Sequence, residues 1–205
     1  MPPRERLRRA NILNRWWLSE GELSKIVEHN PSLRGMLFGY VSEFKVRKLW
    51  FEGAKFSEIK KYDDHDRSKK GDLSFIYKGA EIRVEVKGLQ TKTVKKTGDD
   101  EWEGTFQCDA SDRRKVTLPN GVSLATTCLQ VGEFDLLAVS LFQFGDQWRF
   151  AFAGNSALPR SQYRSYDPVK VQPYLLKSNM KITWPLSPPY RDEPFALLDE
   201  IAAEK

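Results

Sequence analysis

Residues 71–88 read GDLSFIYKGAEIRVEVKG, and this stretch decides the fold. Apolar and polar residues alternate on both sides of Lys78-Gly79, which is the pattern of two β-strands joined by a tight turn. The apolar set comprises Leu73, Phe75 and Tyr77 on the first strand and Ile82, Val84 and Val86 on the return. The sequence therefore predicts a β-hairpin with one apolar face and one polar face.

The turn also predicts which residues face each other. We expect Tyr77 to pair with Ala80 across the turn. Continued along both strands, this register places Asp72 opposite Glu85, with their Cβ atoms about 5 Å apart. Lys87 follows two residues after Glu85, so its side chain emerges on the same polar face. Two carboxylates this close repel unless a cation or a shared proton offsets the cost. Such ligands suit Mg²⁺, which activates water for phosphodiester hydrolysis, while the lysine positions that water or stabilises developing negative charge.

At these residues the chain resembles the PD-(D/E)xK nuclease superfamily, which contains many restriction endonucleases, Holliday-junction resolvases and repair nucleases. Asp72 matches the single aspartate of the motif, and Glu85-Val86-Lys87 matches its (D/E)xK tripeptide. Gly71 stands where the superfamily's name has a proline, a departure that many members share. The resemblance covers roughly residues 35–142, and the hairpin context of the short motifs carries more weight than their letters.

The resemblance implies further site residues. It places an acidic residue on the helix before the sheet, and Glu43, at the margin of the apolar stripe of a helix predicted over residues 33–51, occupies that place. The implied metal ligands are Asp72, Glu85 and Glu43. Lys87 would orient the attacking water, and Gln90 matches a polar position that some members use near the scissile phosphate. The implied cofactor is Mg²⁺, with Mn²⁺ as a substitute.

The resemblance implies an α/β fold, with a restriction-endonuclease-like core in which helices flank a central mixed β-sheet. The implied activity is that of a Mg²⁺-dependent DNA endonuclease, and DNA is preferred to RNA by analogy alone. A two-fold homodimer would suit double-strand cleavage, because one site cuts one strand. The need for a further protein partner stays open.

Three alternatives remain for the charged hairpin. A structure-specific nuclease for junctions, flaps or mismatches would use the same residues. A nucleic-acid-binding or assembly module would keep the fold without catalysis. The charged residues could also form the solvated face of a purely structural hairpin, since alternating charge on exposed strands is ordinary.

We expect a single domain with additions. Its predicted parts are a helical extension at residues 1–31, a catalytic core at 32–154 that contains an insertion at 88–132, and a C-terminal elaboration at 155–205.

Local patterns refine these parts. Ser19 and Glu22 predict a capping box at the start of a helix. Residues 119–121, Pro-Asn-Gly, predict a turn within the insertion. A second hairpin is predicted over residues 134–154, and its first strand is apolar enough for burial on both faces. A closing amphipathic helix is predicted over residues 193–204.

Charge and composition limit the classes of function. The 205 residues, of which 12% are aromatic, suffice for a sizeable core. The net charge is +5 and the isoelectric point about 9.1. The basic clusters that we predict to contact phosphates are Arg4, Arg6, Arg8, Arg9, Lys92, Lys95, Lys96, Arg113, Arg114, Lys115, Arg160 and Arg164. Such contacts attract any nucleic acid and read no base sequence.

The cysteines and the apolar runs indicate which cellular compartment to expect. Cys108 and Cys128, with two histidines, cannot make a structural zinc site, and we expect reduced thiols in a cytoplasm. The longest apolar run, residues 134–142, is too short to span a bilayer, so no membrane role is predicted.

Two other acidic groups compete with the hairpin as metal sites. Residues 63–66, Asp-Asp-His-Asp, are consecutive, and consecutive residues rarely converge on one ion. We expect them to form a solvated loop or a secondary contribution to the site. Glu133 and Asp135 lack a following lysine and are better explained as the start of a strand.

Overall fold

The computed structural model describes residues 11–62 and 71–205, and the chain divides into two compact units. The first unit ends at Val41 and the second begins at Ser42. This boundary lies inside a helix, C-terminal to the boundary expected at residue 31.

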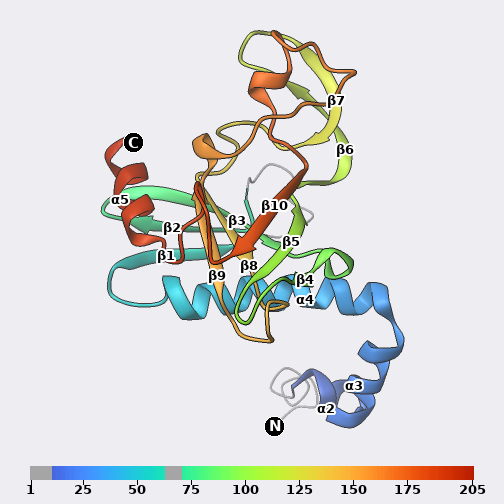
Figure 1. Ribbon diagram of the computed structural model, residues 1–205. Helices are drawn as coiled ribbons and strands as arrows, with labels where there is room; N and C mark the ends of the chain where they lie inside the picture. Colours follow the sequence, from blue (N-terminus) through green and yellow to red (C-terminus); the bar gives the residue numbers. More distant parts are fainter. Residues whose placement is uncertain (1–10, 63–70) are drawn as a thin grey trace. The chain divides into compact units, whose positions relative to one another are not determined.

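The first unit is helical in its described part. Its helices are α2 (Ile12–Trp16), α3 (Glu20–His29) and the larger part of α4 (Pro31–Val46), which Figure 1 shows in blue. Ser19 Oγ accepts a hydrogen bond from Glu22 N (3.2 Å), and Glu22 Oε2 accepts one from Ser19 N (2.8 Å). The predicted capping box is therefore confirmed.

The second unit is built on a five-stranded sheet with the order β1-β2-β3-β8-β9. Its strands are β1 (Phe56–Lys61), β2 (Leu73–Tyr77), β3 (Ala80–Gly88), β8 (Leu136–Ser140) and β9 (Phe150–Gly154). β3 and β8 are parallel and lie side by side in Figure 1, whereas the other neighbours are antiparallel. The predicted α/β class with a central mixed sheet is confirmed.

The β2–β3 hairpin has the predicted register. The ladder pairs Tyr77 with Ala80 at the turn and Leu73 with Val84 at the other end. Lys78 and Gly79 both have positive φ, 50° and 86°, which gives a two-residue turn whose twist matches that of the strands. Local turn chemistry thus sets the alignment of the two strands.

The second predicted hairpin, β8–β9, lies on one side of the sheet, with β9 as the edge strand. All five residues of β8 are buried, as expected for a strand that is covered on both faces. Gly145 and Asp146 have positive φ values, 82° and 55°, within the connection between the two strands.

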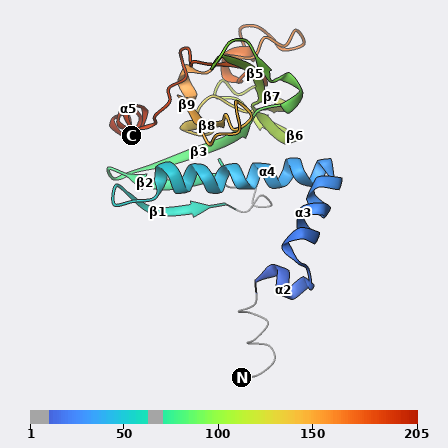
Figure 2. The same ribbon diagram turned by 60° about the horizontal axis from the view of Figure 1, so that its bottom comes forward.

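Helical segments of the second unit, which begins at Ser42 within α4, cover one face of the sheet. The helix predicted over residues 33–51 is α4, which continues into a wider π-helical segment, η1 (Arg47–Phe51). The closing helix is α5 (Phe195–Ala203), which contacts β3 and β9 and lies beside β3 in Figure 2. The core on this face includes Val46, Phe51, Phe75, Val84, Phe152 and Leu198.

A second, three-stranded sheet covers part of the opposite face. Its order is β10-β5-β4, from β4 (Lys95–Lys96), β5 (Trp102–Gln107) and β10 (Asn179–Trp184). The core between the two sheets includes Phe106, Leu137, Val139, Met180 and Ile182. The insertion therefore belongs to the body of the unit, because β5 pairs along its length with β10 from the C-terminal region.

The rest of the insertion forms a separate hairpin. Its strands are β6 (Asp109–Thr117) and β7 (Ser123–Cys128), and the predicted turn at residues 119–121 joins them. Short helical turns complete the unit: η2 (Thr91–Thr93), η3 (Asn155–Ala157) and η4 (Gln172–Tyr174).

Candidate active site

The β2–β3 hairpin brings Asp72 beside Glu85. Asp72 directly precedes the ladder, and its backbone N donates to Val84 O at 2.8 Å. Its carboxylate Oδ2 accepts a 2.7 Å hydrogen bond from Val86 N, the residue after Glu85. Two hydrogen bonds thus fasten Asp72 to the β3 backbone on either side of Glu85.

The position of β3 in the sheet buries the charged side chains. Glu85 and Lys87 are the ladder partners of Leu137 and Val139 on β8. Because ladder partners share a face of the sheet, the two charged side chains lie beside the core that the second sheet covers. The Glu85 side chain is 11% exposed and the Lys87 side chain 20% exposed.

Burial and charge act together on Asp72. Burial and, after it, the charge of Glu85 raise the pKa of its carboxyl group to about 8, although Lys87 and the Val86 N–H act in the lowering direction. The site therefore stores electrostatic repulsion, which either a bound proton or a bound cation relieves.

Lys87 is a fixed ammonium group at this site. Its Nζ lies 2.7 Å from Glu85 Oε1 and donates to the backbone carbonyl of Asp109 at 3.2 Å. Burial lowers the pKa of Lys87, but the negative charges of Glu85 and Asp72 outweigh burial and raise it overall. Lys87 therefore stays charged, and its two partners restrict where the charge can lie.

Glu43 approaches this site from α4. It is 8% exposed and forms an ion pair with Lys61 of β1. Its charge adds to the raised pKa of Asp72, after the larger contributions of burial and Glu85. Within the described ranges, no group of three or more His, Cys, Asp and Glu side chains could hold a metal ion. The three-carboxylate site that includes Glu43 stays a prediction.

The donor set of Asp72 and Glu85 nevertheless fits Mg²⁺. This ion is usually bound through one or two carboxylates, with waters and substrate phosphates completing its shell. The raised pKa of Asp72 indicates a place where added positive charge is stabilising. Asp72 and Glu85 are therefore the residues that could hold the ion.

Gln90 is connected to the site through neighbouring side chains. Its Oε1 accepts from Thr105 Oγ1 at 2.9 Å, and its Nε2 donates to Gln107 Oε1 at 3.3 Å. Gln107 Nε2 in turn donates to Asp109 Oδ2 at 2.8 Å, and the backbone carbonyl of Asp109 accepts from Lys87. Gln107 and Asp109 were not predicted as site residues. Any residue type has a backbone carbonyl, so the contact of Lys87 with the Asp109 carbonyl cannot be recognised from the sequence.

Glu133 and Asp135, the alternative acidic pair of the sequence, each form an ion pair with an arginine. Arg114 binds the carboxylate of Glu133 through both terminal nitrogens. Arg83 binds Asp135 through Nε at 3.1 Å and a terminal nitrogen at 3.2 Å. Burial raises the pKa of Asp135, but hydrogen bonds from Arg83 and Lys205 outweigh it and lower the pKa overall.

Some of the predicted phosphate-contacting residues are exposed, and others are bound to groups within the protein. Lys92, Lys95, Lys96, Arg113, Lys115 and Arg164 are exposed. Arg160 donates to the carbonyls of Leu158 and Ser156, and Arg114 is bound to Glu133. We therefore leave these two arginines out of the proposed DNA surface. Arg4, Arg6, Arg8 and Arg9, and the acidic residues 63–66, lie outside the described residues.

Cys108 and Cys128 are free, buried thiols. Burial raises the pKa of Cys108 to about 12, although the charge of Lys87 lowers it. A thiol so protonated is a poor nucleophile, so Cys108 acts as a packing residue. Among the described helices, none is both long and apolar enough to cross a bilayer.

Comparison with known proteins adds a single likeness. No family model matches the chain, and neither does any curated protein. Among solved structures, the chain is similar to a bacterial homing endonuclease, I-Ssp6803I, with 15% identity and a TM-score of 0.42. The alignment covers 85% of this chain and 97% of that one. At this TM-score and identity, the assignment of the fold rests on the chain's own sheet topology.

Proposed function

We propose that the protein is a Mg²⁺-dependent DNA endonuclease of the restriction-endonuclease-like type. The observation that carries this proposal is the convergence of Asp72, Glu85 and Lys87 on one partly buried face of the β2–β3 hairpin. A structural hairpin gains no stability from two neighbouring carboxylates, one of which has a pKa of about 8. The arrangement supports a site built for a cation and an anionic substrate.

The residues of the chain take distinct roles in this proposal. Asp72 and Glu85 would hold Mg²⁺, which would supply Lewis-acid polarisation of the phosphate and lower the pKa of a water. Lys87 presents a permanent positive charge that orients the attacking water and stabilises the charge developing on the phosphate. The Asp109 carbonyl positions Lys87, and Glu43 adds negative charge that strengthens cation binding.

DNA is the proposed partner, and a two-fold homodimer the proposed assembly. The exposed basic residues named above would contact phosphates without reading base sequence. One Asp72–Glu85–Lys87 site cuts one strand, so double-strand cleavage would require two copies of the site. Plasmid cleavage separates the cases, because one site yields nicked circles and two coupled sites yield linear DNA directly.

The test is cleavage of supercoiled plasmid, linear duplex and branched DNA with Mg²⁺ or with chelator. Wild type is compared with Lys87→Ala and with Lys181→Ala, which removes a lysine whose side chain is 65% exposed on β10. Metal-dependent cutting that Lys87→Ala abolishes and Lys181→Ala retains supports the proposal. Cutting of branched DNA alone would favour a structure-specific nuclease. Binding without cutting on any substrate would favour the non-catalytic module.

A further inference from the structure

A cavity of about 520 Å³ opens between the β6–β7 hairpin and the segment that leads into β10. The two segments are joined by backbone hydrogen bonds from Leu176 N to Leu129 O (2.8 Å) and from Val131 N to Tyr174 O (3.0 Å). Figure 1 shows the orange segment before β10 running beside β7. The volume lies within the range of about 300–1,000 Å³ that is typical of small-molecule sites.

Two tyrosines form an aromatic wall of this cavity. The Tyr163 and Tyr166 rings meet edge to face, with centroids 5.2 Å apart and planes at 65°. The Tyr166 hydroxyl is 2.7 Å from the buried Thr126 hydroxyl, and Gln172 Nε2 donates to the backbone carbonyls of both tyrosines. Tyr163 remains 63% exposed. One ring is therefore fixed within the wall, and the other presents an open surface.

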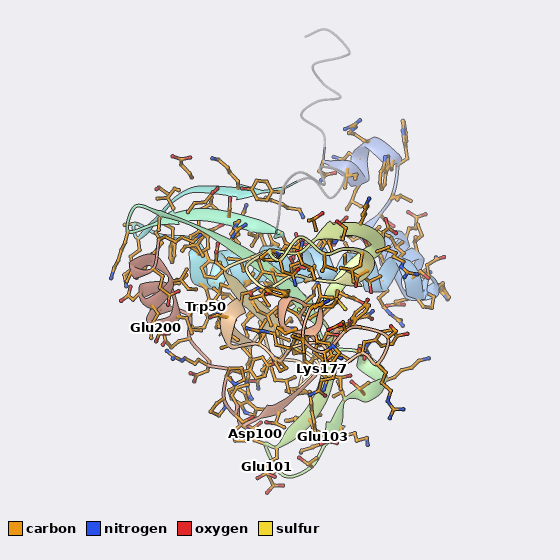
Figure 3. All side chains as sticks on the ribbon, turned by 90° about the horizontal axis from the view of Figure 1, so that it is seen from above. Trp50, Asp100, Glu101, Glu103, Lys177 and Glu200 are labelled. Carbon is orange, nitrogen blue, oxygen red and sulfur yellow. The ribbon has the colours of Figure 1, made fainter. Side chains whose placement is uncertain are left out.

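The polar lining of the cavity is cationic. Arg113 and Lys177 contribute positive charge, and no Asp or Glu is among the described residues that line the cavity. Arg113 donates through Nε to Ala125 O at 3.2 Å, a contact that engages neither terminal nitrogen of the guanidinium group. Figure 3 labels Lys177 on the segment entering β10, and it labels Asp100, Glu101 and Glu103 together near the β4–β5 connection. The cavity is thus suited to an anionic ligand.

We propose that this cavity binds one unstacked nucleotide, with its base against Tyr163 and its phosphate against Arg113 and Lys177. An aromatic ring stacks on any base, and a guanidinium group pairs with phosphate oxygens. Side chains of Gln162 and Asn179 at the rim supply amide donors and acceptors for a base edge. A cationic ligand would be repelled by the two positive charges of the lining, and an uncharged one would make no ion pair with either of them.

The cavity adjoins the candidate active site without sharing a side chain with it. Cys128 lines the cavity and is the ladder partner of Asp109, whose carbonyl holds Lys87. A nucleic-acid strand whose scissile phosphate lies near Lys87 could therefore place a nearby nucleotide in the cavity. If the bound nucleotide is part of a DNA strand, the inference rests on the proposed function. A free nucleotide would bind whether or not the protein cleaves DNA.

The test measures binding in chelator, so that cleavage plays no part. Fluorescence anisotropy compares a paired duplex with the same duplex carrying one extrahelical nucleotide, and dAMP is titrated as a competitor. Wild type is compared with Tyr163→Ala, Tyr163→Phe and Lys177→Gln. Lys181→Gln is the matched control, because Lys181 is an exposed lysine of β10 that neither lines the cavity nor belongs to the proposed DNA surface.

We expect wild type to bind the extrahelical duplex about 10-fold more tightly than the paired one, or to bind dAMP directly. Tyr163→Ala should remove that binding, Lys177→Gln should weaken it, and Tyr163→Phe and Lys181→Gln should retain it. Preference for the extrahelical duplex identifies a strand-borne nucleotide, and competition by dAMP identifies a free one. Absence of both in wild type, or survival of either in Tyr163→Ala, overturns the inference. Retained binding by a protein that fails to cleave would overturn the proposed function alone.

Discussion

Glu85 and Lys87 form an ion pair of 2.7 Å between two side chains of the same strand, both largely withdrawn from solvent. Asp72 adds a second carboxylate whose charge helps to raise the pKa of Lys87. The cluster therefore contains one cation for two carboxylates. Removing that cation should affect stability as well as catalysis, because breaking a buried pair leaves an uncompensated charge.

Lys87→Met should abolish cleavage and also destabilise the metal-free protein. We expect a loss of about 3–5 kcal/mol in the free energy of unfolding, and each kcal/mol lowers Tm by about 2–4 °C in a domain of this size. Thermal unfolding in chelator and with Mg²⁺ measures the effect, and Mg²⁺ should restore part of the loss. Lys181→Met is the exposed control. An unchanged Tm together with a wild-type cleavage rate would contradict the assignment of Lys87.

Asp72→Asn should remove the loss of stability that the ionisation of Asp72 causes as the pH rises in chelator. The pKa of Asp72 is raised from 3.8 to about 8 in the folded protein, so the folded state holds a proton that the unfolded state releases. The resulting stabilisation is fully present below about pH 4 and is lost as the pH rises through about 8. Asn stays neutral, so the variant should gain Tm relative to wild type between pH 5 and pH 9, as measured by thermal scans.

The same variant should lose its response to Mg²⁺. At pH 8, Mg²⁺ should raise the Tm of wild type and leave that of Asp72→Asn nearly unchanged, because ligand binding stabilises only the folded state that holds it. An equal rise in both proteins would count against Asp72 as a ligand.

Glu43→Gln should weaken Mg²⁺ binding without removing the site. Loss of a residue that supports metal ligands typically costs about 10–100-fold in affinity or activity, and we expect a shift of this size in the Mg²⁺ dependence of cleavage. Glu58→Gln is the matched control, because Glu58 is an exposed glutamate of β1 that pairs with Lys60. A Mg²⁺ titration curve for Glu43→Gln that coincides with the Glu58→Gln curve would remove Glu43 from the site.

Arg83→Leu should destabilise the protein at neutral pH and flatten its acid unfolding. The pKa of Asp135 is lowered by its partners, so Asp135 stabilises the fold above its unfolded pKa, and that contribution is lost as the pH falls through the folded pKa. Each lost hydrogen bond between Arg83 and Asp135 should lower the free energy of unfolding by at most about 1.5–3 kcal/mol. Urea unfolding at pH 7 and pH 3 measures both effects. Arg191→Leu breaks an exposed pair with Glu200 and should cost under about 1 kcal/mol.

Turn chemistry and residue alternation were enough to predict the central hairpin. Lys78-Gly79 adopts the predicted two-residue turn, and each residue outward from it falls in the predicted register. This succeeded because a two-residue turn fixes pairing locally, and a period of two assigns each side chain to a face. The proximity of Asp72 and Glu85 followed directly from the same pattern.

The second sheet could not be predicted in this way. β5 and β10 pair from Trp102–Trp184 to Gln107–Asn179, and neither strand's sequence indicates its partner. Pairing between segments so far apart in the sequence depends on the core that they share, which includes Phe106, Met180 and Ile182. The same pairing packs the insertion against the rest of the second unit.

The sequence by itself determined the hairpin, its register and the carboxylate pair, because these depend on neighbouring residues and a turn. Only the tertiary structure decided that Lys87 would be held by the Asp109 carbonyl, that Glu43 would pair with Lys61, and that a cationic cavity would form beside Tyr163. Each of these contacts joins residues far apart along the chain. Their meeting is set by how the sheets and helices pack, which no local pattern encodes.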